Sequence, residues 1–119
     1  MIQNTTKDFT DNPFVENAEV HWEVLSEKVK RKILVYDRQV MLVCVVFQKG
    51  GIGELHSHPH TQMSYIEQGV FEVEIDGKKK TLQKGDAFYV PSNSVHGVRC
   101  LEDGVLMDVF NPMREDFIS

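Results

Sequence analysis

Residues 50–69 read GGIGELHSHPHTQMSYIEQG and contain three of the five histidines of the chain. His56 and His58 are two residues apart, so in an extended strand their side chains lie on the same face. Gln62 has the same parity and lies on that face too if Pro59 does not change the register. The segment therefore indicates two imidazoles and one amide oxygen directed at a common centre.

A second segment, residues 85–96, reads GDAFYVPSNSVH and ends in a fourth histidine. A lone histidine is more often a core or surface residue than a ligand, but a His-x-His pair with two further donors between spaced glycines is typical of a metal site. We predict that one divalent transition metal is bound by His56, His58, Gln62 and His96. Four ligands leave one or two coordination positions open, which is typical of a catalytic site. Mixed nitrogen and oxygen donors admit Ni, Zn, Mn, Fe or Co.

The neutral amide of Gln62 affects which substrate such a metal site would bind. Three neutral imidazoles and one amide leave the full 2+ charge of the metal uncompensated, so the sequence predicts a small anionic substrate. His60 follows Pro59, which is expected to turn the chain. We therefore place His60 in the pocket wall or behind the ligands, outside the ligand set.

The composition is that of an ordinary soluble protein, and 119 residues indicate a single domain. Lys and Arg number 13 against 18 Asp and Glu, which argues against nucleic acid as a partner because its binding depends on clustered positive charge. The first twenty residues contain no apolar run, so we expect no secretory signal, no transmembrane helix and no membrane partner. Cys44 and Cys100 have no metal-ligand spacing, and a reducing cytoplasm fits them best.

Short apolar runs and turn signals recur about every ten residues, which predicts an all-β sandwich or barrel. Gln39–Phe47 has the composition of a buried strand, and residues 71–75 alternate between apolar and acidic side chains before an Asp76-Gly77 turn. Residues 1–14 are polar and expected to be loosely ordered, so the folded domain is predicted to span residues 15–119. Further strands are expected at residues 81–82, 87–90, 95–101 and 105–110, with Asp103-Gly104 between the last two.

The two histidine-bearing segments resemble the two signature motifs of the cupin superfamily. The first motif is matched throughout except that Gln62 takes the place of the usual glutamate. The second keeps its histidine, His96, but has Asn93 where a glycine is usual and Cys100 where an asparagine is usual. Neither departure removes a ligand. The resemblance implies a single-domain double-stranded β-helix, a jelly-roll-like barrel that holds the metal near one mouth.

Two charged residues near the C-terminal end are candidates for the chemistry. Asp108 has apolar neighbours on both sides, so partial burial is expected to raise its pKa and suit it to act as a general acid or base. Arg114 offers a planar fork that matches a carboxylate with two hydrogen bonds. The alternative from spacing alone is that Asp108 and Arg114 pair with each other or cap a loop.

Over about residues 30–118 the chain resembles the pectin-degradation cupins of the KdgF type. In that family the three histidines and the glutamine bind the metal, and the resemblance places Asp108, Phe110 and Arg114 in the active site. It implies opening of 4,5-unsaturated uronate monosaccharides to linear keto-uronates, and it also implies a homodimer. The segments that carry the resemblance are Arg31–Leu34, Met41–Val43, the HSHPHTQ run, Phe71-Glu72 and the closing stretch from Asp108 to Phe117.

Two other classes of function fit the same scaffold. An O₂-dependent cupin dioxygenase would use the same ligands with iron, although the neutral Gln62 and the carboxylate-binding Arg114 weigh mildly against it. A non-enzymatic module could instead bind a small organic acid through the metal. An epimerase-type cupin is disfavoured because those sites work without metal, whereas all four ligand positions are kept here.

Overall fold

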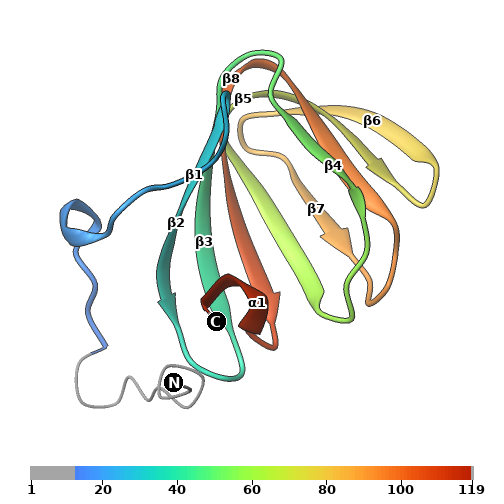
Figure 1. Ribbon diagram of the computed structural model, residues 1–119. Helices are drawn as coiled ribbons and strands as arrows, with labels where there is room; N and C mark the ends of the chain where they lie inside the picture. Colours follow the sequence, from blue (N-terminus) through green and yellow to red (C-terminus); the bar gives the residue numbers. More distant parts are fainter. Residues whose placement is uncertain (1–12, 119) are drawn as a thin grey trace.

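The computed structural model describes residues 13–118, which form antiparallel strands and a short C-terminal helix (Figure 1). Of the N-terminal segment predicted to be loosely ordered, residues 1–12 lie outside the described part of the chain. Within residues 13–118 no helix is long and apolar enough to cross a membrane. In order, the elements are η2 (Asn17–Glu19), β1 (Glu23–Ser26), β2 (Val29–Tyr36), β3 (Met41–Phe47), β4 (Ile52–His56), β5 (Thr61–Ile75), β6 (Lys78–Gln83), β7 (Ala87–Val90), β8 (His96–Asn111) and α1 (Glu115–Ile118).

Two long strands, β5 and β8, pair with each other and connect the two halves of the barrel. The first half of β5 pairs with β7 and its second half with β6. In the same way β8 pairs with β4 near its beginning and with β3 towards its end. Each long strand therefore belongs to both halves of the barrel. The two halves diverge from each other on either side of the interior (Figure 1). The predicted all-β barrel is confirmed.

The prediction of two separate strands around Asp103-Gly104 is wrong, because β8 continues through this point. The strand bends here against β5, whose register with β8 shifts between Gln68 and Val70. A Cβ atom on Gly104 would lie 2.5 Å from a ring carbon of Phe71 and 2.7 Å from the Gln68 carbonyl oxygen. Glycine thus permits a close approach of two chains at a barrel corner, whereas the sequence pattern indicated a turn.

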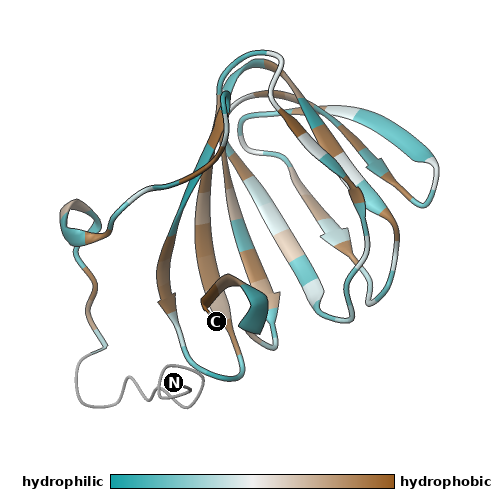
Figure 2. Ribbon diagram, viewed as in Figure 1, coloured by the Kyte–Doolittle hydropathy of each residue, from teal (hydrophilic) through white to brown (hydrophobic). Residues whose placement is uncertain are grey.

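The apolar core lies on the inner face of the barrel. Alternate residues of β3 point inward, so Met41, Val43, Val45 and Phe47 are buried while the residues between them are half-buried on the outer face. The strand predicted at residues 39–47 is confirmed, and its hydrophobic colour is visible in Figure 2. At the centre the fully buried ring of Phe71 packs edge to face on Phe47, with 5.1 Å between centroids.

The same alternation brings polar residues into one part of the interior. On β8 the inward positions are Leu106, Asp108 and Phe110, and all three are buried. On β5, Gln62 lies opposite Phe110, and Ser64 lies opposite Asp108. Strand pairing fixes these neighbours. The candidate ligand Gln62 and the candidate acid Asp108 are therefore diagonal neighbours on the inner face, in adjacent inward-facing pairs of β5 and β8.

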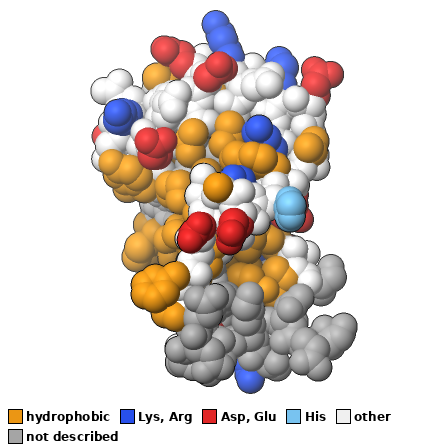
Figure 3. All heavy atoms as spheres, turned by 90° about the vertical axis from the view of Figure 1, so that its left-hand side faces the viewer, with side chains coloured by type: hydrophobic (Ala, Val, Ile, Leu, Met, Phe, Trp, Pro, Cys, Tyr) orange, Lys and Arg blue, Asp and Glu red, His pale blue; other side chains and the backbone are white. Residues whose placement is uncertain are grey.

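The outer face has both covered and exposed apolar parts. The chain before β1 covers β2, where the Lys32 ammonium lies 3.0 Å from the Asn17 carbonyl oxygen and 4.5 Å from the centre of the Trp22 ring. On β5, by contrast, Met63 and Tyr65 point outward and are exposed. Seen from the left of Figure 1, hydrophobic side chains also gather below a rim of charged ones (Figure 3). Cys44 of β3 is half-buried.

Candidate metal centre and active-site cavity

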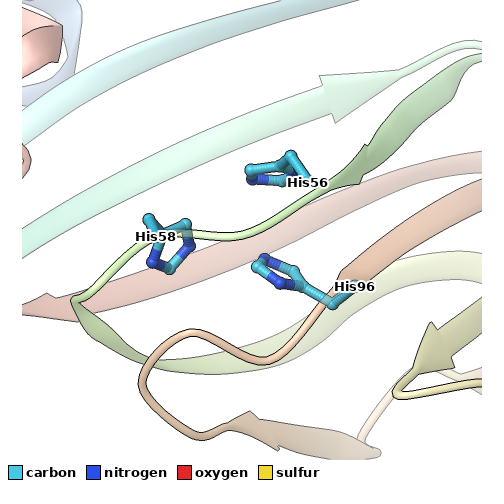
Figure 4. Close-up of side chains that lie close together, drawn as sticks. All are labelled: His56, His58 and His96. Atoms are coloured by element: carbon cyan, nitrogen blue, oxygen red, sulfur yellow. The ribbon is translucent and has the colours of Figure 1, made fainter.

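The structure brings His56, His58 and His96 together from three places in the chain (Figure 4). His56 ends β4 and is paired with His96 at the beginning of β8, which places their ring centroids 4.4 Å apart. His58 lies in the loop between β4 and β5, and its ring centroid is 4.9 Å from that of His96. One nitrogen from each ring can be chosen so that all three lie within 4.8 Å of one another.

Backbone carbonyl groups fix the orientation of all three rings. Each Nδ1 lies within hydrogen-bond distance of a carbonyl oxygen two residues away in the chain: 2.8 Å for His56, 3.0 Å for His58 and 2.9 Å for His96. A carbonyl oxygen can only accept, so each Nδ1 carries the proton. In the neutral ring Nε2 is then an unprotonated nitrogen with a free lone pair, which is the form that binds metals.

Gln62 adds an oxygen to the same centre. Its Oε1 atom lies 3.1 Å from Nε2 of His58 and 3.2 Å from Nε2 of His96. Since the Nδ1 atoms carry the protons, these are contacts between lone pairs, and such a group is unfavourable unless a cation lies between its members. Ligands at right angles about a metal at about 2.1 Å are about 3 Å apart, as observed for these pairs. The four predicted ligands therefore fit one divalent transition metal.

Burial keeps two of the histidine ligands uncharged. Desolvation, followed by the positive charge of Arg114, lowers the pKa of His58 to about 4. Desolvation is also the main cause that lowers the pKa of His96 below its ordinary value. Both rings are thus neutral at pH 7 and ready to donate to a metal, and with the amide of Gln62 they add no negative charge to the site.

Asp108 lies near the metal centre and has the perturbed pKa that its apolar neighbours predicted. Its side chain is 9% exposed, and burial raises its pKa to about 6, although the hydrogen bond from Ser64 and the charge of Arg114 act to lower it. The Ser64 hydroxyl donates to Asp108 Oδ1 over 2.6 Å. A carboxyl group of this kind can hold or release a proton near neutral pH.

Arg114 pairs with Asp116, so the suggested ion pair between Asp108 and Arg114 is absent from the described residues. Nε and Nη2 of Arg114 donate to the two carboxylate oxygens of Asp116 over 3.1 and 2.9 Å. Although burial acts to raise it, these hydrogen bonds hold the pKa of Asp116 below its ordinary value. The pairing orients the guanidinium 5.1 Å from the ring centre of Phe110, whose ring also packs against His58 with 5.7 Å between centroids.

A cavity of about 410 Å³ adjoins the metal centre, and its lining side chains include His56, Gln62, His96, Asp108, Phe110 and Arg114. Its walls also include Arg31 of β2 and Phe117 of α1, to which sequence reasoning gave no separate role. The Arg31 guanidinium lies 3.7 Å from the centre of the Phe117 ring, and that of Arg114 lies 4.3 Å from it. The cavity thus offers two guanidinium groups.

Sequence reasoning also missed Ser64, whose only signal was its parity with Gln62 on an expected strand. Arg31 faces the cavity because it lies opposite the inward-facing Val45 of β3, a register that the spacing of residues in the sequence does not give. His60 lies outside the group of metal-ligating side chains, as expected. Its backbone carbonyl oxygen accepts the hydrogen bond from His58 Nδ1 and so helps to orient that ligand.

A barrel of this topology with histidines at the mouth of its interior defines a cupin. The cupin domain family matches residues 43–110, and the chain belongs to it. Within that family the chain is 47% identical over 102 residues to the pectin degradation protein KdgF of Dickeya dadantii (strain 3937), which covers 84% of the chain and 93% of the relative. The chain therefore belongs to the KdgF family of cupins.

Two solved structures are similar to the chain. The structure of KdgF from Halomonas sp. has a TM-score of 0.85 and 40% sequence identity, covering 88% of this chain and 97% of that chain. An RmlC-like cupin from Shewanella frigidimarina has a TM-score of 0.86 and 39% identity, with 88% and 95% of the two chains covered. The likeness thus extends over nearly the whole length of both relatives.

Proposed function

We propose that this protein is a metal-dependent enzyme that opens 4,5-unsaturated uronate monosaccharides, the products of pectin or alginate lyases, to linear keto-uronates. The observation that carries the proposal is the position of Asp108. Its buried carboxyl, with a pKa of about 6, lies on the inner face of the barrel, in the inward-facing residue pair next to the one that contains Gln62. An enol ether opens after protonation at carbon, and this chemistry requires an acid that is protonated near neutral pH inside a binding cavity.

The charges of the cavity support an anionic sugar as the ligand. Four uncharged ligands leave the 2+ charge of a bound metal uncompensated, and Arg114 adds a guanidinium group, whereas that of Arg31 is paired with Glu23 over 3.1 Å. The edge of Arg114 formed by Nε and Nη2 is occupied by Asp116, so a substrate carboxylate would meet its remaining N–H groups. The volume of about 410 Å³ lies in the range of small-molecule sites.

Each residue then has a defined task. His56, His58, Gln62 and His96 would hold the metal, which when bound polarises substrate oxygen atoms as a Lewis acid. Arg114 binds the uronate carboxylate, and the ring of Phe110 packs on the sugar face. Asp108 gives its proton to C4, water adds at C5 and returns a proton to the Asp108 carboxylate, and the resulting hemiketal opens to the C5 ketone. Positioned proton transfer of this kind contributes on the order of 10²–10⁴ in rate.

The decisive experiment supplies freshly prepared unsaturated galacturonate or mannuronate to the protein loaded with each candidate metal. Loss of the ultraviolet absorbance of the conjugated alkene, faster than the spontaneous rate, is the expected result. Asp108→Asn at the same metal occupancy should bind the uronate but turn it over at least 100-fold more slowly. Wild-type protein at full metal occupancy that leaves both uronates unchanged would refute the proposal.

The same samples separate the other two classes. Oxygen uptake by the iron-loaded protein with a diketone or flavonol would identify a dioxygenase. Saturable binding of a uronate without turnover would identify a binding module. The homodimer and the cytoplasmic location remain predictions.

A further inference from the structure

A continuous chain of hydrogen bonds connects the metal centre to Asp108 through Ser64. Nε2 of Gln62 lies 2.9 Å from the Ser64 hydroxyl oxygen, and that oxygen lies 2.6 Å from Oδ1 of Asp108. All three side chains are buried, and Ser64 is only 2% exposed. The contacts arise because Gln62 and Ser64 are successive inward residues of β5, while Asp108 is directly opposite Ser64 on β8. Because the Ser64 hydroxyl is buried, bulk water does not compete for these hydrogen bonds.

The directions of these hydrogen bonds follow from the chemistry of the groups. An ionised Asp108 can only accept, so the single hydroxyl proton of Ser64 is donated to Oδ1. The Ser64 oxygen is then free to accept from the Gln62 amide nitrogen, which can only donate. The amide is thereby oriented with its NH₂ group towards Ser64 and its oxygen towards the histidines. The opposite orientation would direct N–H groups at the place of the metal.

We propose that Ser64 is a positioning residue that couples the metal ligand Gln62 to Asp108. Through Ser64, the carboxylate determines that the amide oxygen, and not the amide nitrogen, points at the metal. The same contact determines which oxygen of Asp108 is available for chemistry. Oδ1 is occupied by the hydroxyl, and Oδ2 has no hydrogen-bond partner among residues 13–118, so an acid proton on Asp108 is held on Oδ2.

The proposal has two consequences that need no substrate. Without the hydroxyl, Asp108 loses the donor that stabilises its charged form, so its pKa should rise above about 6. The loss of a hydrogen bond to a charged carboxylate corresponds to a rise of about one unit in its pKa. Without the hydroxyl, the Gln62 amide is also free to rotate. Metal affinity should then fall about tenfold, as it does when a hydrogen bond that orients a metal ligand is lost.

The test compares Ser64→Ala and Ser64→Cys with Ser64→Thr, which keeps the hydroxyl. Carbon-13 NMR of the Asp108 carboxyl in metal-free protein gives its pKa, and calorimetric titration with Zn²⁺ gives metal affinity. Alanine and cysteine should both raise the pKa by about one unit and weaken Zn²⁺ binding about tenfold, whereas threonine should match wild type. Cysteine fills the space of the side chain, so it keeps the test valid if alanine fails to fold.

Ser57→Ala is the matched control, because Ser57 lies between two ligands in sequence but is exposed, with no side-chain hydrogen bond among the described residues. It should leave both quantities unchanged. An unchanged Asp108 pKa and Zn²⁺ affinity in the alanine and cysteine variants would overturn the proposal, and so would equal losses in the threonine variant. The link to catalysis rests on the proposed function, but these measurements do not, so a protein inactive on uronates could still pass them.

Discussion

Replacing Asp108 by asparagine should stabilise the metal-free protein above pH 6. Burial raises the pKa of this carboxyl from 3.8 to about 6, so the charged form is disfavoured in the folded state. A rise of about two units corresponds to about 3 kcal/mol of lost stability at pH 8. Asparagine removes this cost and keeps an acceptor for Ser64, whose hydrogen bond to the charged carboxylate is already included in the pKa of about 6. The expected gain is therefore about 3 kcal/mol.

The sign of the pH dependence makes this prediction specific. A carboxyl whose pKa is raised on folding binds more protons in the folded than in the unfolded state, so folding stability falls as pH rises from about 4 to 6. Below pH 4 both states are protonated and the cost disappears. The difference in stability between Asp108→Asn and wild type should therefore be largest at pH 8 and should close as pH falls to about 4.

The assay is urea or thermal unfolding of both proteins in chelator at several pH values. The chelator is needed because a bound cation would itself lower the pKa of Asp108. At pH 8 the melting temperature should rise by about 10 °C or more. Glu102→Gln is the control for removal of an exposed carboxylate, and we expect little change. An asparagine variant that is no more stable than wild type at pH 8 would show that Asp108 bears no desolvation cost.

Three other predictions concern the metal, the barrel corner and the outer face. Gln62→Glu should retain the metal but weaken malonate or uronate binding, because it removes one positive charge from the centre; equal affinities by calorimetry would exclude this electrostatic role. Gly104→Ala should lower stability by more than about 2 kcal/mol in urea unfolding, since its Cβ would lie 2.5 Å from the Phe71 ring, and a melting temperature like that of wild type would contradict this. If the predicted homodimer forms through the exposed side chains of Met63 and Tyr65, Tyr65→Lys should give a monomer by light scattering; a monomeric wild type would refute the dimer itself.

The sequence alone determined about half of the strands and the residues that could bind metal, but it gave no separate strand for β1, β2 or β4. Alternation with a period of two is a local property, so the buried strand β3 could be predicted from spacing. His56 and His58 do meet at one centre as predicted, but His58 reaches it from the loop after β4 and not from a shared strand. The burial and raised pKa of Asp108 likewise followed from its apolar neighbours in the chain. The ends of the strands were predicted less well, because Asp103-Gly104 can form either a turn between two strands or a bend in a continuing strand.

Only the tertiary structure decided which of these side chains meet. Ser64 and Asp108 are far apart in the chain, and their contact depends on the register of β5 against β8. The pairing of Arg114 with Asp116 depends on the C-terminal turn, where Asp108 was an equally plausible partner by spacing. Arg31 enters the cavity because β2 places it opposite an inward residue of β3. Spacing along a strand gives the face on which a side chain lies, but cross-strand register gives its neighbours, and that register is fixed by the packing of the whole barrel.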